Sequence, residues 1–171
     1  NSEVIKIVES LSHQKGKANA LAQLATLATA DYFLITDADM LLPATWIKQM
    51  INEFEDNTGI VTGVTHTSDN KPQGCDWLFA LGMVRVLHDY NLPVTTMGNN
   101  MAIKKEAYQA VGGYESIPFS ITEDLELFEQ VHSKGYKVKQ LYRKEVLGNT
   151  KAAFGFGNIL EQRKRWMLGA V

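Results

Sequence analysis

The fold of this chain is predicted by the segment YFLIT at Tyr32–Thr36, which is followed directly by DAD at Asp37–Asp39. The five residues of the first segment carry no charge, which is typical of a strand buried on both faces of a mainly parallel sheet. Apolar residues at helical spacing precede it at 17–29, and Pro43 suits the first turn of a helix that runs to about residue 54. Strands that alternate with helices in this way indicate an α/β fold.

The rest of the chain continues the alternation without an internal repeat, a low-complexity tract or a linker. We therefore expect a single domain over residues 1–171. The expected strands and extended segments are 4–8, 59–65, 94–103 and 136–147, and the expected helices are 73–90, 104–111, 123–133 and 158–168.

Composition and charge exclude several classes of protein. The 171 residues are 45% hydrophobic and 21% charged, as in globular domains and unlike a disordered tail or a disulfide scaffold. The net charge of −2 argues against a nucleic-acid-binding protein. Residues 134–171 carry nine Lys and Arg against two Asp and Glu, which suits phosphates, an anionic membrane surface or an ordinary solvated face. No apolar run reaches the ~18 residues that a membrane-spanning helix needs.

Asp37 and Asp39 are candidate metal ligands. They lie two residues apart after a buried strand, so both side chains point the same way, at the edge of the sheet where α/β proteins bind ligands. Paired carboxylates suit a hard cation such as Mg²⁺ or Mn²⁺, which would neutralise a leaving diphosphate. A turn capped by the two aspartates explains the same pattern. Among the histidines only His66, after a strand, suits a third ligand, and Cys75 has no partner pattern and is expected to be inert.

Two helix starts carry further polar residues. Lys17 and Asn19 open the first helix, where free N–H groups and a lysine suit a phosphate, although an ordinary solvated helix start has the same character. Glu123 and Asp124 open a later helix, and a carboxylate held there would suit a general base for a hydroxyl group. The capping-box spacing of Ser120 and Glu123 offers a purely structural explanation.

The segment QRKRW at Gln162–Trp166 is the most unusual in the chain. On a helix, Gln162, Arg165 and Trp166 share one face, which offers an amide, a guanidinium fork for phosphate and an aromatic plane for a sugar ring. A core tryptophan beside solvated arginines is the alternative. The segment GNN at Gly98–Asn100 is compatible with a tight turn or with a close approach of the backbone to a ligand.

Taken in order, these segments resemble the family 2 glycosyltransferases, which have a GT-A fold, a Rossmann-like α/β architecture with a mainly parallel sheet flanked by helices. The resemblance spans residues 15–169 and points to the Q-X-X-R-W branch, which includes cellulose, hyaluronan and poly-N-acetylglucosamine synthases. Its elements are KANAL at Lys17–Leu21, DAD at Asp37–Asp39, GNN at Gly98–Asn100 with GGY at Gly112–Tyr114, TED at Thr122–Asp124 and QRKRW at Gln162–Trp166.

The resemblance implies a role for each element. Asp39 would bind a Mg²⁺ or Mn²⁺ ion on the donor diphosphate, with Asp37 beside it on the nucleotide-sugar. Asp124 would be the catalytic base that deprotonates the acceptor hydroxyl for inverting transfer. The remaining site residues are Lys17 and Asn19 near the nucleotide, and Gly98, Asn99, Asn100, Glu123, Gln162, Arg165 and Trp166 at the acceptor and diphosphate end.

The resemblance also predicts partners and a location. The donor would be a nucleotide-diphosphate sugar, first of all a UDP-sugar, and the acceptor a saccharide or a lipid-linked saccharide. The family begins with a strand like I-I-P-A-Y-N-E and a second strand that ends in an aspartate pair. Neither precedes Val4, so we expect a partial catalytic domain. We expect this piece to be soluble and the full-length protein to work at the cytoplasmic face of a membrane.

Two other classes of function stay open at this point. A nucleotidyltransferase can also use a carboxylate-bound metal on an α/β sheet, although it would leave TED and Q-X-X-R-W unexplained. A non-catalytic binding domain that keeps the fold is the other class.

Overall fold

The computed structural model describes residues 14–67, 71–151 and 155–169. The expected strand at 4–8 lies outside these residues. The helices are α1 (Gly16–Leu27), α2 (Trp46–Ile51), α3 (Lys71–Asp89), α4 (Lys105–Ala110), α5 (Gly113–Ser116), α6 (Glu123–Ser133), the 3₁₀ helix η1 (Lys144–Val146) and α7 (Phe156–Gly169). The strands are β1 (Tyr32–Thr36), β2 (Thr58–Thr62), β3 (Thr65–Thr67), β4 (Asn100–Lys104), β5 (Lys137–Gln140) and β6 (Gly148–Thr150).

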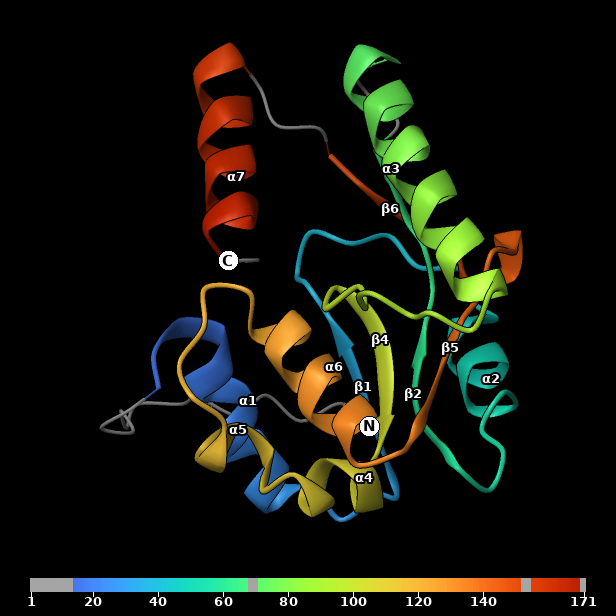
Figure 1. The fold of residues 1–171 in the computed structure, drawn as a ribbon, viewed down its shortest axis with the longest axis vertical. Helices are drawn as coiled ribbons and strands as arrows, with labels where there is room; N and C mark the ends of the chain where they lie inside the picture. Colours follow the sequence, from blue (N-terminus) through green and yellow to red (C-terminus); the bar gives the residue numbers. More distant parts are fainter. Residues whose placement is uncertain (1–13, 68–70, 152–154, 170–171) are drawn as a thin grey trace.

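Four strands form the main sheet in the spatial order β1-β4-β2-β5 (Figure 1). Strands β1, β2 and β5 run in the same direction, and β4 runs against them between β1 and β2. The expected α/β class is confirmed. The expected mainly parallel sheet holds for the direction of three of the four strands, whereas β4 pairs antiparallel with both of its neighbours. The pairing of β4 with β1 sets Asn100 opposite Thr36, so the start of β4 and the end of β1 lie at one edge of the sheet.

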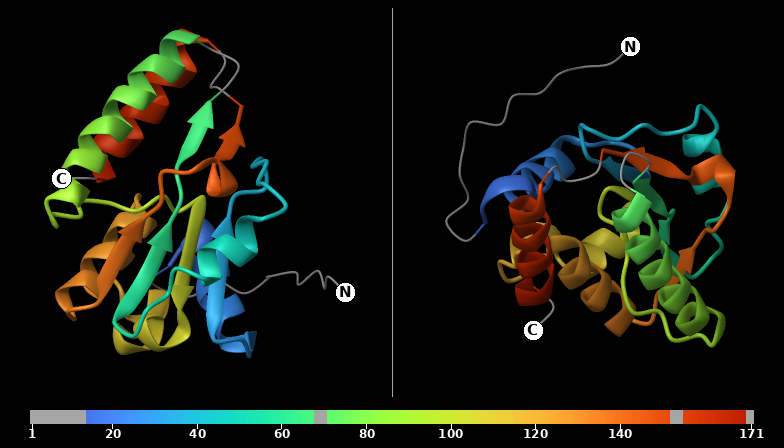
Figure 2. Two further views of the ribbon diagram at one scale, coloured as in Figure 1. Left: turned by 90° about the vertical axis from the view of Figure 1, so that its right-hand side faces the viewer. Right: turned by 90° about the horizontal axis from the view of Figure 1, so that it is seen from above.

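The main sheet separates two apolar cores, because alternate residues along a strand point to opposite faces. On β4, Met101 and Ile103 join the core formed with α1, α4, α5 and α6, and Ala102 joins the core formed with α2. Figure 2 shows the sheet between these helical layers. This arrangement explains why the strands are apolar on both faces, as the charge-free segment YFLIT predicts.

Two predicted elements are interrupted or shortened. The strand expected at 59–65 is broken at Gly63 into β2 and β3, and a Cβ atom on Gly63 would lie 2.6 Å from the side-chain amide of Asn100. The helix expected to open at Pro43 begins only at Trp46, whose N–H donates to the Pro43 carbonyl in the preceding turn.

The other expected elements agree more closely with the structure. The helix expected at 123–133 is α6 with the same bounds, and the helix expected at 158–168 lies within α7. The extended segment at 94–103 forms a strand only in β4, and the strand expected at 136–147 forms only β5, because η1 follows it.

A parallel two-stranded ribbon of β3 and β6 continues beyond the main sheet, and α3 packs on β3. The long helices α3 and α7 lie at this end of the molecule (Figure 1). In the parts of the chain that the structure describes, no helix combines the length and the hydropathy needed to cross a membrane.

Candidate functional site

The ammonium group of Lys17, in the first turn of α1, lies where three other segments of the chain meet. Its Nζ atom donates to Asp37 Oδ1 at 2.5 Å and to the Gly98 carbonyl at 3.0 Å, and it lies 3.7 Å from Glu123 Oε1. The side chains of Lys17, Asp37 and Glu123 are all partly buried. Four of the segments that the sequence singles out, namely KANAL, DAD, GNN and TED, therefore meet at one point, which we call the Lys17 cluster.

Backbone donors hold both carboxylate oxygens of Asp124. The N–H of Gly98 donates to Oδ2 at 2.8 Å, and the N–H of Leu125 donates to Oδ1 at 3.0 Å. The Thr96 hydroxyl donates to the Asp124 carbonyl at 3.3 Å. A Cβ atom at position 98 would lie 2.5 Å from Asp124 Cβ, so this close approach requires glycine. The Asp124 carboxylate is therefore fixed in one orientation at the start of α6.

The topology of the sheet explains why these segments meet. Strand β1 ends at Thr36, directly before Asp37, and the reversed strand β4 begins at Asn100, directly after Gly98 and Asn99. Since Thr36 pairs with Asn100, the two loops leave the sheet at the same edge. The first turns of α1 and α6 reach this edge as well, and the positive dipole end of a helix favours nearby carboxylates.

Burial affects the protonation of one carboxyl group in the Lys17 cluster. It raises the pKa of the Glu123 carboxyl above its usual value; the Asp124 and Asp37 carboxylates act in the same direction, and the backbone N–H of Glu123 and the Lys17 ammonium oppose it. Burial also raises the pKa of the Tyr114 hydroxyl well above its usual value, with contributions from Glu123 and Asp124. The site thus contains a carboxyl group whose neutral form persists to a higher pH than in water.

Asp39 lies on the exposed side of the DAD segment. Its Oδ2 accepts a long hydrogen bond of 3.4 Å from the Thr150 hydroxyl. Carboxylate oxygens of this kind fit a hard divalent cation. Over residues 14–67, 71–151 and 155–169, however, no three His, Cys, Asp or Glu side chains form a group that could hold a metal ion. His66, on β3 opposite Asn149, is therefore not brought together with Asp37 and Asp39 as a third ligand.

The side chain of Asn100 holds parts of the fold together, contrary to the expectation that it lines the acceptor side. Its side chain is fully buried. Its amide oxygen accepts from the indole N–H of Trp46 at 2.7 Å, and its amide nitrogen donates to the carbonyls of Val64 and Val146 at 2.9 Å each. Both amide hydrogens are used within the chain, so this side chain has no donor left for an acceptor molecule.

Asn99 and Asn19 differ from Asn100 because both are partly exposed. The Asn99 side-chain oxygen accepts from the Thr65 hydroxyl at 2.8 Å. The Asn19 side-chain oxygen accepts from the Gln23 amide at 3.1 Å, one turn further along α1. Partial exposure of both amides is compatible with the ligand-binding roles that the resemblance implies.

Helix α7 contains the Q-X-X-R-W segment. Because it is helical over Phe156–Gly169, Gln162, Arg165 and Trp166 share one face, as their spacing predicts. Gln162 is partly buried. The side chains of Arg165 and Trp166 lie outside the described part of the structure, so the Lys17 cluster is defined by the other four segments.

The start of α6 differs from the capping box that the sequence allows. The N-cap is Thr122, which makes no side-chain capping bond, and the Ser120 hydroxyl accepts from the Thr122 N–H at 3.2 Å. The Glu123 carboxylate instead faces Lys17. Thr96, whose hydroxyl donates to the Asp124 carbonyl at the same helix start, belongs to none of the sequence motifs. Its only sign in the sequence is its place two residues before GNN.

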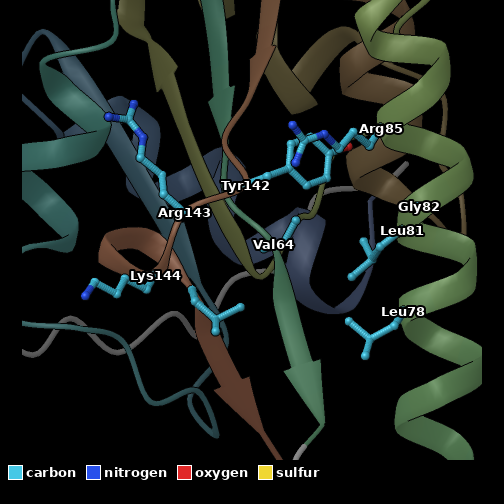
Figure 3. A pocket seen from close by; sticks show the side chains of 9 residues that line it. Val64, Leu78, Leu81, Gly82, Arg85, Tyr142, Arg143 and Lys144 are labelled. Atoms are coloured by element: carbon cyan, nitrogen blue, oxygen red, sulfur yellow. The ribbon is translucent and has the colours of Figure 1, made fainter.

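A separate hollow of about 320 Å³ lies between α3 and the segment 142–147 (Figure 3). The guanidinium carbon of Arg85 lies 5.0 Å from the centre of the Tyr142 ring at one end of it. Its lining contains none of the candidate site residues. The apolar part of the lining consists of Val64, Leu78, Leu81 and Leu147.

The chain is similar to curated synthases of a bacterial polysaccharide. It is 28% identical over 171 residues to the poly-beta-1,6-N-acetyl-D-glucosamine synthase of Staphylococcus aureus (strain COL) and 26% identical over 167 residues to that of Staphylococcus epidermidis. These matches cover 95% and 93% of this chain. They cover 40% of each relative, so the chain spans about two fifths of the length of the relatives that it matches.

Solved structures of glycosyltransferases have a similar fold. The mannosyltransferase PcManGT from Pyrobaculum calidifontis, in complex with GDP-Man and Mn²⁺, matches with a TM-score of 0.65 at 22% identity, over 90% of this chain and 41% of that chain. Glucosyl-3-phosphoglycerate synthase from Mycobacterium tuberculosis, in complex with Mn²⁺ and UDP-glucose, matches with a TM-score of 0.56 at 12% identity, over 89% of this chain and 52% of that chain. The expected GT-A fold is confirmed by this likeness.

A family model matches nearly the whole chain, over residues 7–168. This model describes glycosyl transferase family 21, whereas the sequence motifs resemble the family 2 glycosyltransferases. The expectation of a glycosyltransferase is confirmed. The match includes all four segments that meet in the Lys17 cluster and the Q-X-X-R-W segment on α7. The chain therefore belongs to glycosyl transferase family 21.

Proposed function

We propose that this chain is part of the catalytic domain of an inverting, metal-dependent glycosyltransferase. It would move a sugar from a nucleotide-diphosphate sugar to an acceptor hydroxyl. The observation that carries this proposal is the Lys17 cluster, in which DAD, GNN and TED meet at the sheet edge where α/β proteins bind ligands. Family membership and the named relatives support the transfer of a sugar.

Asp124 is the proposed general base. Each of its carboxylate oxygens accepts one backbone N–H, which orients the group and leaves a further lone pair on each oxygen. The acceptor hydroxyl would give its proton to Asp124 while its oxygen bonds to the anomeric carbon of the sugar. The bond from that carbon to the diphosphate would break on the opposite face, so that the configuration inverts and the diphosphate leaves with the electron pair.

Asp39 is the proposed protein ligand of a Mg²⁺ or Mn²⁺ ion. Asp37 is occupied by the Lys17 ammonium at 2.5 Å, whereas Asp39 is exposed and its contact with Thr150 is long. A divalent ion bound there would neutralise charge on the donor diphosphate. The Mn²⁺ in both similar structures supports an ion of this type.

The donor, the acceptor and the location belong to the same proposal. The similar structures are complexes with GDP-Man and UDP-glucose, and the curated relatives are named as synthases of poly-beta-1,6-N-acetyl-D-glucosamine. We propose a UDP-sugar as the donor and a saccharide or lipid-linked acceptor, in the synthesis of a polysaccharide or glycolipid at the cytoplasmic face of a membrane. The basic segment 134–171 would suit an anionic surface there.

A transfer assay on the full chain tests this function. It uses Mn²⁺ with UDP-N-acetylglucosamine, and with GDP-mannose as a second donor, each labelled separately in the sugar and in the nucleotide. We expect Asp124→Asn to lower turnover by about 10³-fold, because an amide cannot take the proton. Asp31→Asn, an exposed aspartate just before β1, is the matched control and should leave turnover unchanged.

Three outcomes of the assay would contradict the proposal. Turnover of Asp124→Asn at the wild-type rate would exclude Asp124 as the base. Transfer of the nucleotide label in place of the sugar label would indicate a nucleotidyltransferase. A product with the donor's anomeric configuration would exclude inversion.

A further inference from the structure

The Lys17 ammonium group makes two hydrogen bonds and one longer ion pair within the chain itself. An ammonium group has three N–H donors. Two of them serve Asp37 Oδ1 and the Gly98 carbonyl, and Glu123 Oε1 lies 3.7 Å from the same nitrogen. A phosphate that approached this nitrogen would compete with these three oxygen atoms of the chain. The structure therefore argues against a free lysine that waits for the nucleotide.

The contact with Gly98 links Lys17 to Asp124. Lys17 donates to the carbonyl of Gly98, and the N–H of the same glycine donates to Asp124 Oδ2. Glycine has wide backbone freedom, so hydrogen bonds on both sides of its Cα atom are needed to fix its conformation. The preceding N–H of Met97 donates to the Thr62 hydroxyl on β2 at 3.0 Å, which ties the loop to the sheet.

We propose that Lys17 is a positioning residue for the general base: it holds the backbone of Gly98, and Gly98 holds the carboxylate of Asp124. This inference rests on the proposed function of Asp124. It assigns Lys17 to the chemical step rather than to nucleotide affinity. The same ammonium group neutralises Asp37, so one side chain ties the donor side of the site to the base.

The expected effect of removing Lys17 follows from the geometry. Without its contact, the Gly98 carbonyl loses its donor and the Asp124 carboxylate loses a fixed partner. A misplacement of about 1 Å in a reacting group can cost about 100-fold in rate. We therefore expect Lys17→Met, which keeps the apolar stem, to lower kcat by about 100-fold.

Binding and turnover are measured side by side on the full chain. Calorimetry with UDP and Mn²⁺ as the probe gives Kd, and the transfer assay gives kcat and the donor KM. Lys17→Met should keep Kd and KM within about threefold of wild type while kcat falls, and Lys17→Arg should recover part of kcat, since a guanidinium can still reach both acceptors. Lys15→Met, an exposed lysine before α1, is the matched control and should behave as wild type.

Two kinetic results would overturn the positioning role. A tenfold or larger loss of UDP affinity with unchanged kcat would make Lys17 a nucleotide ligand. Unchanged kcat and unchanged Kd would show that the contact with Gly98 has no effect on the base. Thermal denaturation of each variant identifies any that is unfolded, in which case Lys17→Gln, which also removes the ammonium group, takes the place of Lys17→Met in the comparison.

A second measurement does not depend on the transfer reaction. The chain contains one Met–Gly pair, Met97–Gly98. Methionine labelled with ¹³C at its carbonyl, combined with ¹⁵N-glycine, therefore selects the amide of Gly98 in a triple-resonance spectrum. In Lys17→Met we expect this amide to exchange with water at least about tenfold faster, because its hydrogen bond to Asp124 is weakened.

The two measurements separate failure of this inference from failure of the proposed function. An unchanged Gly98 amide in Lys17→Met would overturn the positioning role even where no donor is turned over. If the Gly98 amide exchanges faster in Lys17→Met but the wild-type chain transfers no sugar, the link from Lys17 to Asp124 is retained and the transferase reaction is refuted.

Discussion

Asn100 connects three segments of the chain through one buried amide. It bonds to Trp46 of α2, to the Val64 carbonyl after β2 and to the Val146 carbonyl of η1. Asn100→Ala removes the partners of the Trp46 indole N–H and the Val146 carbonyl, while the Val64 carbonyl keeps only its hydrogen bond from the Gly148 N–H, so the free energy of unfolding should fall by about 3 kcal/mol. Chemical denaturation measures this, with Asn99→Ala as the control that should lose less than about 1 kcal/mol. Equal losses in the two variants would contradict the structural assignment.

Glu123 makes the stability of the folded chain depend on pH. Burial raises its pKa above the ordinary value of 4.5, so the folded state favours the neutral carboxyl. The resulting stabilisation is complete below the unfolded pKa and is lost as the pH rises through the folded pKa. Glu123→Gln is neutral at every pH, so its Tm relative to wild type should increase from about pH 4 to about pH 7.

The control for this titration is Glu126→Gln, one turn further along α6, whose Tm difference from wild type should change less. A Tm difference for Glu123→Gln that decreases toward neutral pH would mean that the ion pair with Lys17 outweighs burial.

At the scale of single residues, the sequence indicates reactive groups better than their surroundings. Asp37 and Asp124 are recognisable because carboxylates follow a buried strand or open a helix. The contact of Lys17 with Gly98 joins positions 81 apart in the sequence, and it follows from topology rather than from a local pattern. Asn100 resembles a ligand-binding residue until Trp46, 54 positions away, is seen to cover it.

Two glycines in regular elements should respond to alanine in opposite ways. In β2, a Cβ atom on Gly59 would lie 2.8 Å from Tyr136 Cβ and 2.9 Å from Val131 Cγ1, so Gly59→Ala should destabilise the fold by about 2 kcal/mol through overpacking. In α3, a Cβ atom on Gly82 meets nothing within 4 Å, so Gly82→Ala should stabilise by about 0.5–1 kcal/mol through helix propensity. Denaturation of both variants checks this, and effects of the same sign would contradict the packing described.

Elements with a strong local pattern are the ones that the sequence predicts well. The stripe of Leu127, Phe128 and Val131 predicts α6, and all three residues are buried in the core. No sequence pattern predicts the direction of β4, because a strand that is apolar on both faces has the same pattern of residues in a parallel and in an antiparallel pairing. The break at Gly63 likewise depends on Asn100, which packs against it from β4.

At the scale of the whole molecule, α3 exposes an apolar stripe on its outward side. Each stripe residue is between 50% and 75% exposed, whereas Leu81, on the packed side, is 6% exposed. The stripe consists of Phe79, Met83 and Val86 on α3 and of Tyr90, which directly follows its last residue. Replacing Phe79 and Val86 together by Lys should change the free energy of unfolding by no more than about 0.5 kcal/mol per site and reduce self-association in light scattering.

Leu81→Lys is the contrasting variant on the same helix. It places a charge where the side chain is buried, so it should destabilise the fold by several kcal/mol. A comparable loss of stability from the two outward substitutions would mean that the stripe is packed in solution.

The place of β4 in the middle of the main sheet matters while the chain is being synthesised. Strands β1 and β2 each pair with β4, and the spatial order keeps them apart from one another. A nascent chain that has not yet released residue 104 from the ribosome therefore carries two apolar strands with open edges, the state in which aggregation competes with folding. When β4 inserts, it pairs both strands and brings Gly98 to Lys17 in the same event. A ribosome stalled upstream of β4 would hold a chain with neither a closed sheet nor an assembled site.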